Sequence, residues 1–256
     1  MNSETIYVYV FCEGRLANQL LAWANGRCVT RNLPNRKLVL NYPPLIGKCS
    51  MPKTVFVQNK GIVLDVCGNW PKATTAELPG MNRSCFWTEA WINRPPPAAI
   101  LEALNEVRFS SRIWDEASAL TRGRKFIGVH IRYGDYEAVD DENQTAPKPV
   151  FPRASNQYYT EALDRCLAML PGSSVFLCTD GEDAEVAWFT ERYHPALQPK
   201  NDGLLDLLTL SKCDIIIASA STFSPLAATL GGKPYIYPGT SPERITEIIA
   251  SVASKP

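Results

Sequence analysis

Short runs of β-branched and aromatic residues alternate along the chain with longer segments in which apolar residues recur every three or four positions. The runs predict buried strands, and the longer segments predict amphipathic helices. Strands are predicted at residues 6–11, 37–40, 54–57, 61–66, 125–131, 174–178, 214–218 and 234–237. Helices are predicted at residues 16–30, 98–107, 112–120, 156–170, 183–193, 204–212, 225–230 and 242–253.

This alternation predicts an α/β fold with parallel sheets that helices cover on both faces. The 256 residues leave room for two lobes of about 120 residues each. We expect an N-terminal α/β lobe at residues 1–115 and a C-terminal Rossmann-like lobe at residues 116–256. Ligands of open parallel sheets bind at the carboxyl ends of the strands, so the residues that follow each strand are the candidates for function.

The charge and the hydropathy of the chain restrict which kinds of partner, nucleic acid or membrane, are expected. Lys and Arg number 26 and Asp and Glu number 26, so a broad basic surface for nucleic acid is not expected. An anionic ligand would instead be held by a few placed residues. No apolar run approaches the roughly 20 residues of a transmembrane helix, and the start of the sequence lacks the pattern of a secretory signal. A cytoplasmic protein without a transmembrane segment is therefore expected.

The eight cysteines are scattered without a CxxC pair, and His130 and His194 are the histidines of the chain. This spacing does not fit a zinc site, so no metal is expected. No cofactor is expected either. Several cysteines lie in apolar strands, where buried reduced thiols are the expected state.

Four loops that follow predicted strands carry the candidate chemistry, and they should meet at one edge of each sheet. The candidate residues in and beside them are Gly14, Asn18, Gln19, His130, Arg132, Asp180, Ser221, Thr222 and Phe223. A guanidinium such as that of Arg132 binds phosphate through two parallel hydrogen bonds. Ser221 and Thr222 precede a short helix, whose first N–H groups favour an anion.

The remaining candidates suit the other parts of a nucleotide. Asp180 and Asp206 can accept N–H groups of a base or hydroxyl groups of a sugar, and Gly14 allows a ligand to approach the backbone. Together these residues predict a site for a nucleoside diphosphate. Structural roles remain open: Arg132 could pair with Asp135, Ser221 and Thr222 could cap the helix, and Asp206 could pair locally. The sequence around Gly14 lacks Gly-x-Gly-x-x-Gly, which disfavours a dinucleotide oxidoreductase.

Four segments, at residues 14–24, 128–136, 158–180 and 206–224, resemble in order the motifs of the bacterial α-1,2-fucosyltransferases, glycosyltransferases of the family 11 type. The second segment, Gly-Val-His-Ile-Arg-Tyr-Gly-Asp-Tyr, is similar to their His-x-Arg-Arg-Gly-Asp-Tyr motif. The sequence departs from the motifs at Tyr133 (arginine in the family), Ala17 (glycine), Ala220 (asparagine) and Pro225-Leu226 (Trp-Trp).

The resemblance implies a GT-B-like fold: two Rossmann-like lobes with a donor cleft between them, the N-terminal lobe on the acceptor side. It implies an inverting, metal-independent transfer of fucose from GDP-fucose to a hydroxyl of a glycan, α-1,2 to a galactoside. It also implies that Arg132 binds the β-phosphate and that His130 and Asp206 lie at the guanine. Ser221 and Thr222 would then bind phosphate oxygens, and Gly14, Asn18 and Gln19 would line the cleft.

A general base for the acceptor hydroxyl is sought in the acidic loop after Arg132. More distant fucosyltransferases place an acid shortly after their arginine motif, which favours Asp140, whereas Asp135 is expected to be structural. Two other functions remain open: transfer from another nucleotide sugar, and binding of a nucleotide or carbohydrate without catalysis. The sequence carries no signal for the oligomeric state.

Overall fold

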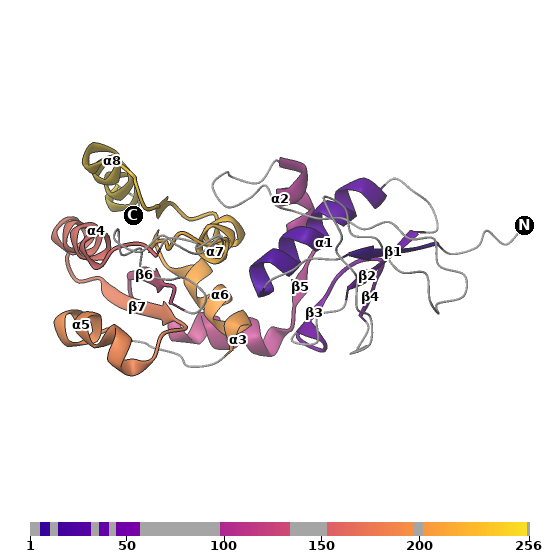
Figure 1. The fold of residues 1–256 in the computed structure, drawn as a ribbon, viewed down its shortest axis with the longest axis horizontal. Helices are drawn as coiled ribbons and strands as arrows, with labels where there is room; N and C mark the ends of the chain where they lie inside the picture. The colour runs from indigo at the N-terminus through magenta and orange to yellow at the C-terminus, as the bar shows by residue number, and fades with distance from the viewer. Residues whose placement is uncertain are drawn as a thin grey trace, which may run out of the picture. The chain divides into compact units, whose positions relative to one another are not determined.

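The computed structural model describes residues 6–10, 15–31, 36–40, 45–56, 98–133, 153–196 and 202–254. The chain divides into two compact units, Met1–Ile113 and Trp114–Pro256 (Figure 1). Gly14, Asp135 and Asp140 lie outside the described residues, as does the strand predicted at 61–66.

The first unit contains a parallel sheet in the order β1-β2-β4. Its strands are β1 (Ile6–Val10), β2 (Arg36–Leu40) and β4 (Thr54–Phe56). Helix α1 (Leu16–Thr30) buries Leu16, Leu20, Leu21 and Trp23, which lie on more than one side of it. A helix buried on several sides belongs to the core, so α1 and the sheet form the centre of this unit.

Two short elements of the first unit differ from the prediction. Helix α2 (Ala98–Leu104) ends before residue 107, and a two-residue strand, β5 (Arg108–Phe109), follows it. This strand pairs antiparallel with β3 (Cys49–Ser50). Strands this short have no periodicity, which is why the apolar pattern did not reveal them.

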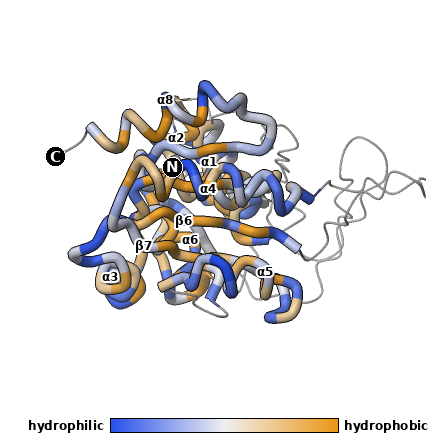
Figure 2. Tube along the Cα trace, turned by 90° about the vertical axis from the view of Figure 1, so that its left-hand side faces the viewer, coloured by the Kyte–Doolittle hydropathy of each residue, from blue (hydrophilic) through white to orange (hydrophobic). Residues whose placement is uncertain are grey.

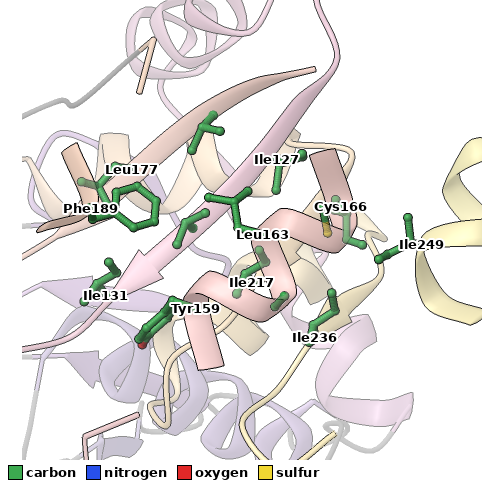
Figure 3. Close-up of a cluster of buried hydrophobic side chains, with 14 of the residues drawn as sticks. Ile127, Ile131, Tyr159, Leu163, Cys166, Leu177, Phe189, Ile217, Ile236 and Ile249 are labelled. Carbon is green, nitrogen blue, oxygen red and sulfur yellow. The ribbon is translucent and has the colours of Figure 1, made fainter. Parts of the chain in front are cut away.

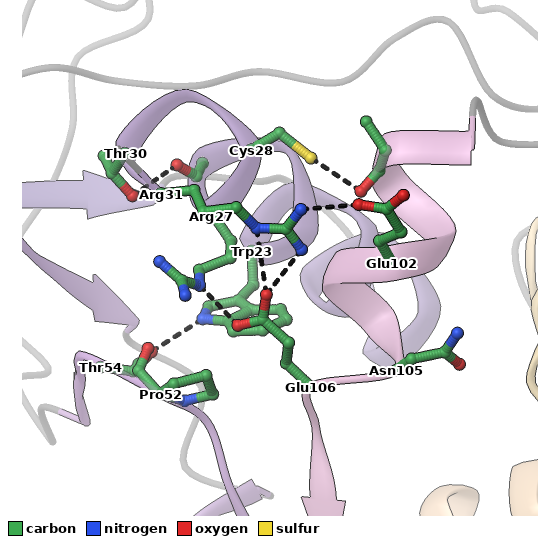
Figure 4. A network of polar contacts seen from close by, with 12 residues as sticks. Trp23, Arg27, Cys28, Thr30, Arg31, Pro52, Thr54, Glu102, Asn105 and Glu106 are labelled. Atoms are coloured by element: carbon green, nitrogen blue, oxygen red, sulfur yellow. Dashed lines mark hydrogen bonds and ion pairs between the residues drawn. The ribbon is translucent and has the colours of Figure 1, made fainter. Parts of the chain in front are cut away.

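Charged side chains join α1 to the end of α2 (Figure 4). Arg31 pairs with Glu102 at 2.7 Å and with Glu106 at 2.6 Å, and Arg27 Nε donates to Glu106 at 2.7 Å. Burial tends to raise the pKa of Glu106, but hydrogen bonds from the two arginines outweigh it and hold this pKa below its usual value. Trp23 Nε1 donates to Thr54 Oγ1 at 2.8 Å, which ties α1 to β4.

The second unit is built on a four-stranded parallel sheet in the order β7-β6-β8-β9. The strands are β6 (Phe126–Ile131), β7 (Ser174–Thr179), β8 (Ile215–Ile217) and β9 (Tyr235–Ile236). The helices are α3 (Ser111–Leu120), which starts before the division between the units, α4 (Asn156–Met169), α5 (Asp183–Tyr193), α6 (Gly203–Lys212), α7 (Phe223–Gly231) and α8 (Pro242–Ala253). The strands β6 and β7 are largely apolar (Figure 2).

Helices cover both faces of this sheet, as the alternating pattern predicts. On one face, α4, α5 and α8 enclose an apolar cluster with alternate strand residues, including Ile131, Leu163 and Ile249 (Figure 3). On the other face, α6 lies so close to Gly128 that an added Cβ would stand 2.6 Å from Leu210 Cδ1. Glycine at 128 therefore permits α6 to pack directly on β6. Because helices cover both faces of the sheet, polar residues gather at the carboxyl ends of its strands.

Candidate functional site

The carboxyl edge of the second sheet brings together most of the residues singled out in the sequence. His130 is the penultimate residue of β6, Arg132 follows that strand, and Asp180 follows the neighbouring strand β7. Ser221 and Thr222 lie between β8 and α7, on the other side of β6, and Phe223 is the first residue of α7. Asn18 and Gln19 belong to α1 of the first unit, where Gln19 is buried and Asn18 half-buried.

Arg132 is held by an acid from the neighbouring strand. Its Nη1 pairs with Asp180 Oδ2, and the other carboxylate oxygen, Oδ1, accepts the backbone N–H of Tyr133 at 2.8 Å. The side chain of Arg132 is only 12% exposed. An ion pair in which the arginine side chain is mostly buried and the acid is also hydrogen-bonded to the backbone orients the guanidinium. Asp180, predicted from the sequence to bind the ligand, is thus also a structural partner of Arg132.

His130 is buried and joins the loop before α7. Its Nδ1 lies 2.7 Å from Ser224 Oγ and 2.9 Å from Ser219 Oγ. Burial lowers the pKa of His130 to about 3; the carboxylate of Asp180 opposes this shift and the charge of Arg132 adds to it. His130 is therefore neutral at physiological pH and acts as a hydrogen-bonding group, not as a cation for phosphate.

The loop before α7 is held by its own serines. Ser219 Oγ lies 2.9 Å from Ser221 Oγ, and Ser221 Oγ accepts the N–H of Phe223 at 3.4 Å. Ser224 Oγ accepts the N–H of Ser219 at 3.2 Å. The ring of Phe223 lies 4.9 Å from that of His130. Ser221 therefore acts inside the loop as a partial cap, while Thr222 occupies the N-cap position of α7 without a side-chain capping bond.

Asp206 lies on α6 beneath the end of β7. It is buried, and its Oδ1 has no hydrogen-bond partner. Burial raises the pKa of Asp206 to about 7; Asp202 adds to this shift, and a hydrogen bond from the thiol of Cys178 opposes it. Thr209, one turn further along α6, is also buried with its hydroxyl unpartnered. A ligand with N–H groups would satisfy such acceptors.

Three residues of this edge were missed in the sequence. Ser219 and Ser224 flank the Ser-Thr-Phe segment, and Thr209 stands three positions after Asp206 on the same helix. Thr209 could have been predicted from its spacing, because residues three apart, such as Asp206 and Thr209, share a helix face. For the two serines the only signal was their position after a strand, since their partner His130 comes from a distant segment.

Within the part of the chain that the structure describes, no group of three His, Cys, Asp or Glu residues is arranged to hold a metal ion. None of the helices there combines the length and apolar character needed to cross a membrane. Cys28, Cys49, Cys166, Cys178 and Cys213 are free thiols.

The model of one protein family, described as glycosyl transferase family 11, matches residues 105–242. This stretch contains β6, β7, β8 and the helices between them. The chain belongs to glycosyl transferase family 11. The match includes His130, Arg132, Asp180, Asp206 and the Ser-Thr-Phe segment, so the sequence resemblance to this family is confirmed over the second unit.

A curated relative and several solved structures are similar to this family 11 chain. Galactoside alpha-(1,2)-fucosyltransferase 2 of Mus musculus is 28% identical over 191 residues, which cover 66% of this chain and 50% of the mouse protein. The chain thus spans about half the length of that relative. POFUT1 in complex with GDP has a TM-score of 0.59 at 16% identity, over 92% of this chain and 99% of that one. Fucosyltransferase NodZ from Bradyrhizobium has a TM-score of 0.55 at 15% identity, over 88% and 92% of the two chains.

These structural likenesses confirm the α/β, GT-B-like fold expected from the sequence. The family 11 chain departs from its motif at Tyr133, where the motif has an arginine. The structure shows that Tyr133 is buried, so the substitution replaces a charged group with part of the core.

Proposed function

We propose that this family 11 protein is an inverting, metal-independent glycosyltransferase that transfers fucose from GDP-fucose to a hydroxyl of a glycan, making an α-1,2 linkage to a galactoside. Family membership and the mouse relative's name support the class and the linkage. One observation carries the proposal: the guanidinium of Arg132, oriented by Asp180, stands after β6 between the ends of β7 and β8. This is where a parallel sheet binds a phosphate.

The reaction breaks the bond between the anomeric carbon of fucose and the β-phosphate oxygen. The acceptor oxygen forms the new bond to that carbon, its proton passes to a base, and the electron pair of the broken bond leaves with GDP. Negative charge grows on the diphosphate as it departs. A preorganised cation at that position stabilises the transition state more than the ground state, and we assign this role to Arg132.

The other residues of the edge bind and orient the donor. Thr222 and the first N–H groups of α7 are suited to phosphate oxygens, because a helix N-terminus favours an anion. His130, which is neutral, fixes this loop through Ser219 and Ser224. Asp206 would accept N–H groups of guanine, for which its carboxylate must be ionised.

The general base and the acceptor side are assigned from the sequence. Asp140, in the acidic loop after Arg132, would accept the proton of the acceptor hydroxyl. Gly14, Asn18 and Gln19 of the first unit would line the donor cleft, and that unit would form the acceptor side. These assignments complete the reaction without a cofactor.

Calorimetric titration with GDP-fucose, GDP-mannose and UDP-galactose tests the donor. We expect the protein to bind both guanine nucleotides and to bind UDP-galactose at least tenfold more weakly. A screen of glycan acceptors with labelled GDP-fucose should then give a product in which fucose is linked α-1,2 to galactose. Preference for a uridine nucleotide would contradict the donor assignment, and tight GDP-fucose binding without transfer to any acceptor would favour a binding protein over an enzyme.

A further inference from the structure

Tyr133, the residue after Arg132, is buried and hydrogen-bonded although it lies outside any helix or strand. Tyr133 is 6% exposed and belongs to the apolar cluster on the α4 face of the second sheet. Its hydroxyl donates to the backbone oxygen of Glu185 at 2.6 Å and accepts Trp188 Nε1–H at 3.1 Å. Both partners lie on α5. The far end of the tyrosine is thus anchored to a helix.

The ring of Tyr133 is held from two further directions. The guanidinium of Arg153 lies 4.5 Å from the ring centre, a cation–π contact. Gly181 lies against the ring, since a Cβ built at residue 181 would stand 2.5 Å from Tyr133 Cδ2. No side chain fits there unless the ring or the loop moves. The ring therefore determines where the backbone at residues 180–181 lies.

The backbone of Tyr133 contacts the same carboxylate that holds Arg132, the candidate for phosphate binding. The two oxygens of Asp180 are divided between the backbone N–H of Tyr133 and the guanidinium of Arg132. Gly181, which the ring contacts, is the next residue after Asp180. A shift of the ring would therefore move this carboxylate, and the guanidinium that it holds would move too.

We propose that Tyr133 is a positioning residue for Arg132: it acts through Asp180 and Gly181 and thereby determines the affinity of the site for the diphosphate of the donor. This proposal rests on the proposed function. It assigns no contact between Tyr133 and the ligand. Tyr133 suits this role because its hydroxyl is anchored on α5 and its backbone N–H on Asp180.

Two variants test the positioning role of Tyr133, one at its hydroxyl and one at its ring. Tyr133→Phe removes the anchor on α5 but keeps the ring, and Gly181→Ala pushes on the ring from the loop. Binding is measured for GDP and for guanosine, which has the base and ribose of GDP but no phosphate. Each variant should weaken GDP binding about tenfold, a loss typical of one hydrogen bond to a charged group. Guanosine binding should change less than twofold.

Tyr193→Phe is the matched control. The hydroxyl of Tyr193, the last residue of the same helix α5, donates an exposed hydrogen bond to Asp164 at 2.8 Å. This variant should leave the GDP-to-guanosine affinity ratio at the wild-type value. In an Arg132→Lys background, Tyr133→Phe should change the ratio no further, because the two residues act in series.

The outcomes separate this proposal from the function on which it rests. Failure of the wild-type protein to bind GDP would overturn the proposed function. Wild-type binding of GDP, with the ratio unchanged in both Tyr133→Phe and Gly181→Ala, would overturn the role of Tyr133 alone. Loss of GDP and guanosine affinity in equal proportion would also overturn it, because a purely structural defect lowers both.

Discussion

His130 Nδ1 lies 2.7 Å from the hydroxyl oxygen of Ser224, although the two residues are 94 positions apart in the sequence. The contact joins the end of β6 to the start of α7, and Ser224 also accepts the N–H of Ser219. The loop that carries Ser221 and Thr222 is therefore fixed by a buried, uncharged network.

Ser224→Ala should destabilise the protein by about 1–3 kcal/mol, because it leaves the buried His130 and the Ser219 N–H without one of their partners. GDP affinity should fall as well, since the loop before α7 loses its anchor. Urea unfolding measures the stability, and titration measures the affinity. Ser251→Ala is the control: its exposed hydroxyl contacts Ile248 on α8, and it should change stability by less than about 0.5 kcal/mol. Equal costs for the two variants would contradict a special role of Ser224.

Arg132→Lys should reduce the rate of fucose transfer by a factor of about 10²–10³, although the charge is kept. Lysine lacks the planar fork that reaches phosphate and Asp180 at the same time. Steady-state kinetics with GDP-fucose measures the loss. The exposed pair of Arg192 and Asp164, joined at 2.7 Å, supplies the control variant Arg192→Lys, which should turn over at the wild-type rate. A fully active Arg132→Lys protein would remove Arg132 from the mechanism.

Asp140→Asn should lower kcat strongly and leave the dissociation constant of GDP unchanged, because a general base acts on the acceptor and not on the donor. The acidic limb of the pH–rate profile should disappear with it. Asp141→Asn removes the neighbouring acid and should retain both activity and profile. If Asp141→Asn is the inactive variant, the base is the adjacent residue.

The helices with clear start and stop signals were predicted with correct bounds. Helix α5 begins with a capping box between Glu182 and Glu185, and α8 begins with Ser241 capping the helix and Pro242 in its first turn. The strands of the second unit were recognisable because both faces are buried, which gives continuous apolar runs. The pair β3–β5 was not predicted, since two residues carry no pattern.

The side-chain pairings at the site could not be predicted from the sequence, for a different reason. Arg132 forms an ion pair with Asp180, 48 positions away, which the sequence did not predict. Asp135, the partner considered from the sequence, lies outside the described residues. Local spacing cannot show which loops the order of strands brings together. The type of each residue was informative, because phosphate chemistry restricts the choice to a few side chains. Its partners depend on the strand order.

Asp206 should make GDP binding depend on pH. Its pKa in the free protein is raised to about 7, and it must be ionised to accept N–H groups of guanine. GDP affinity should therefore rise as the pH increases from 6 to 8 and then level off. Asp206→Asn should bind GDP weakly, with little pH dependence over this range. Titration at half-unit intervals in matched buffers tests this, and parallel pH profiles for the two proteins would exclude Asp206 as the group responsible.

The same residue should make stability depend on pH, with a sign opposite to that of His130. The folded-state pKa of Asp206 lies above its unfolded value of 3.8, so the stability it contributes is present below that value and is lost as the pH rises to about 7. The full loss is on the order of 4 kcal/mol. The pKa of His130 is lowered from 6.5 to about 3, so its contribution is present above pH 6.5 and is lost as the pH falls.

Between about pH 4 and 6.5 the two slopes oppose each other, and the wild-type stability should change little from these groups. Single variants should reveal each slope in urea unfolding. Relative to wild type, Asp206→Asn should gain stability as the pH rises from 5 to 8, because it removes the cost of a buried charge. Relative to wild type, His130→Gln should gain as the pH falls from 6.5 to 4, because no buried imidazole then resists protonation. A stability difference from wild type that stays constant with pH in either variant would show that the residue is not a buried titrating group.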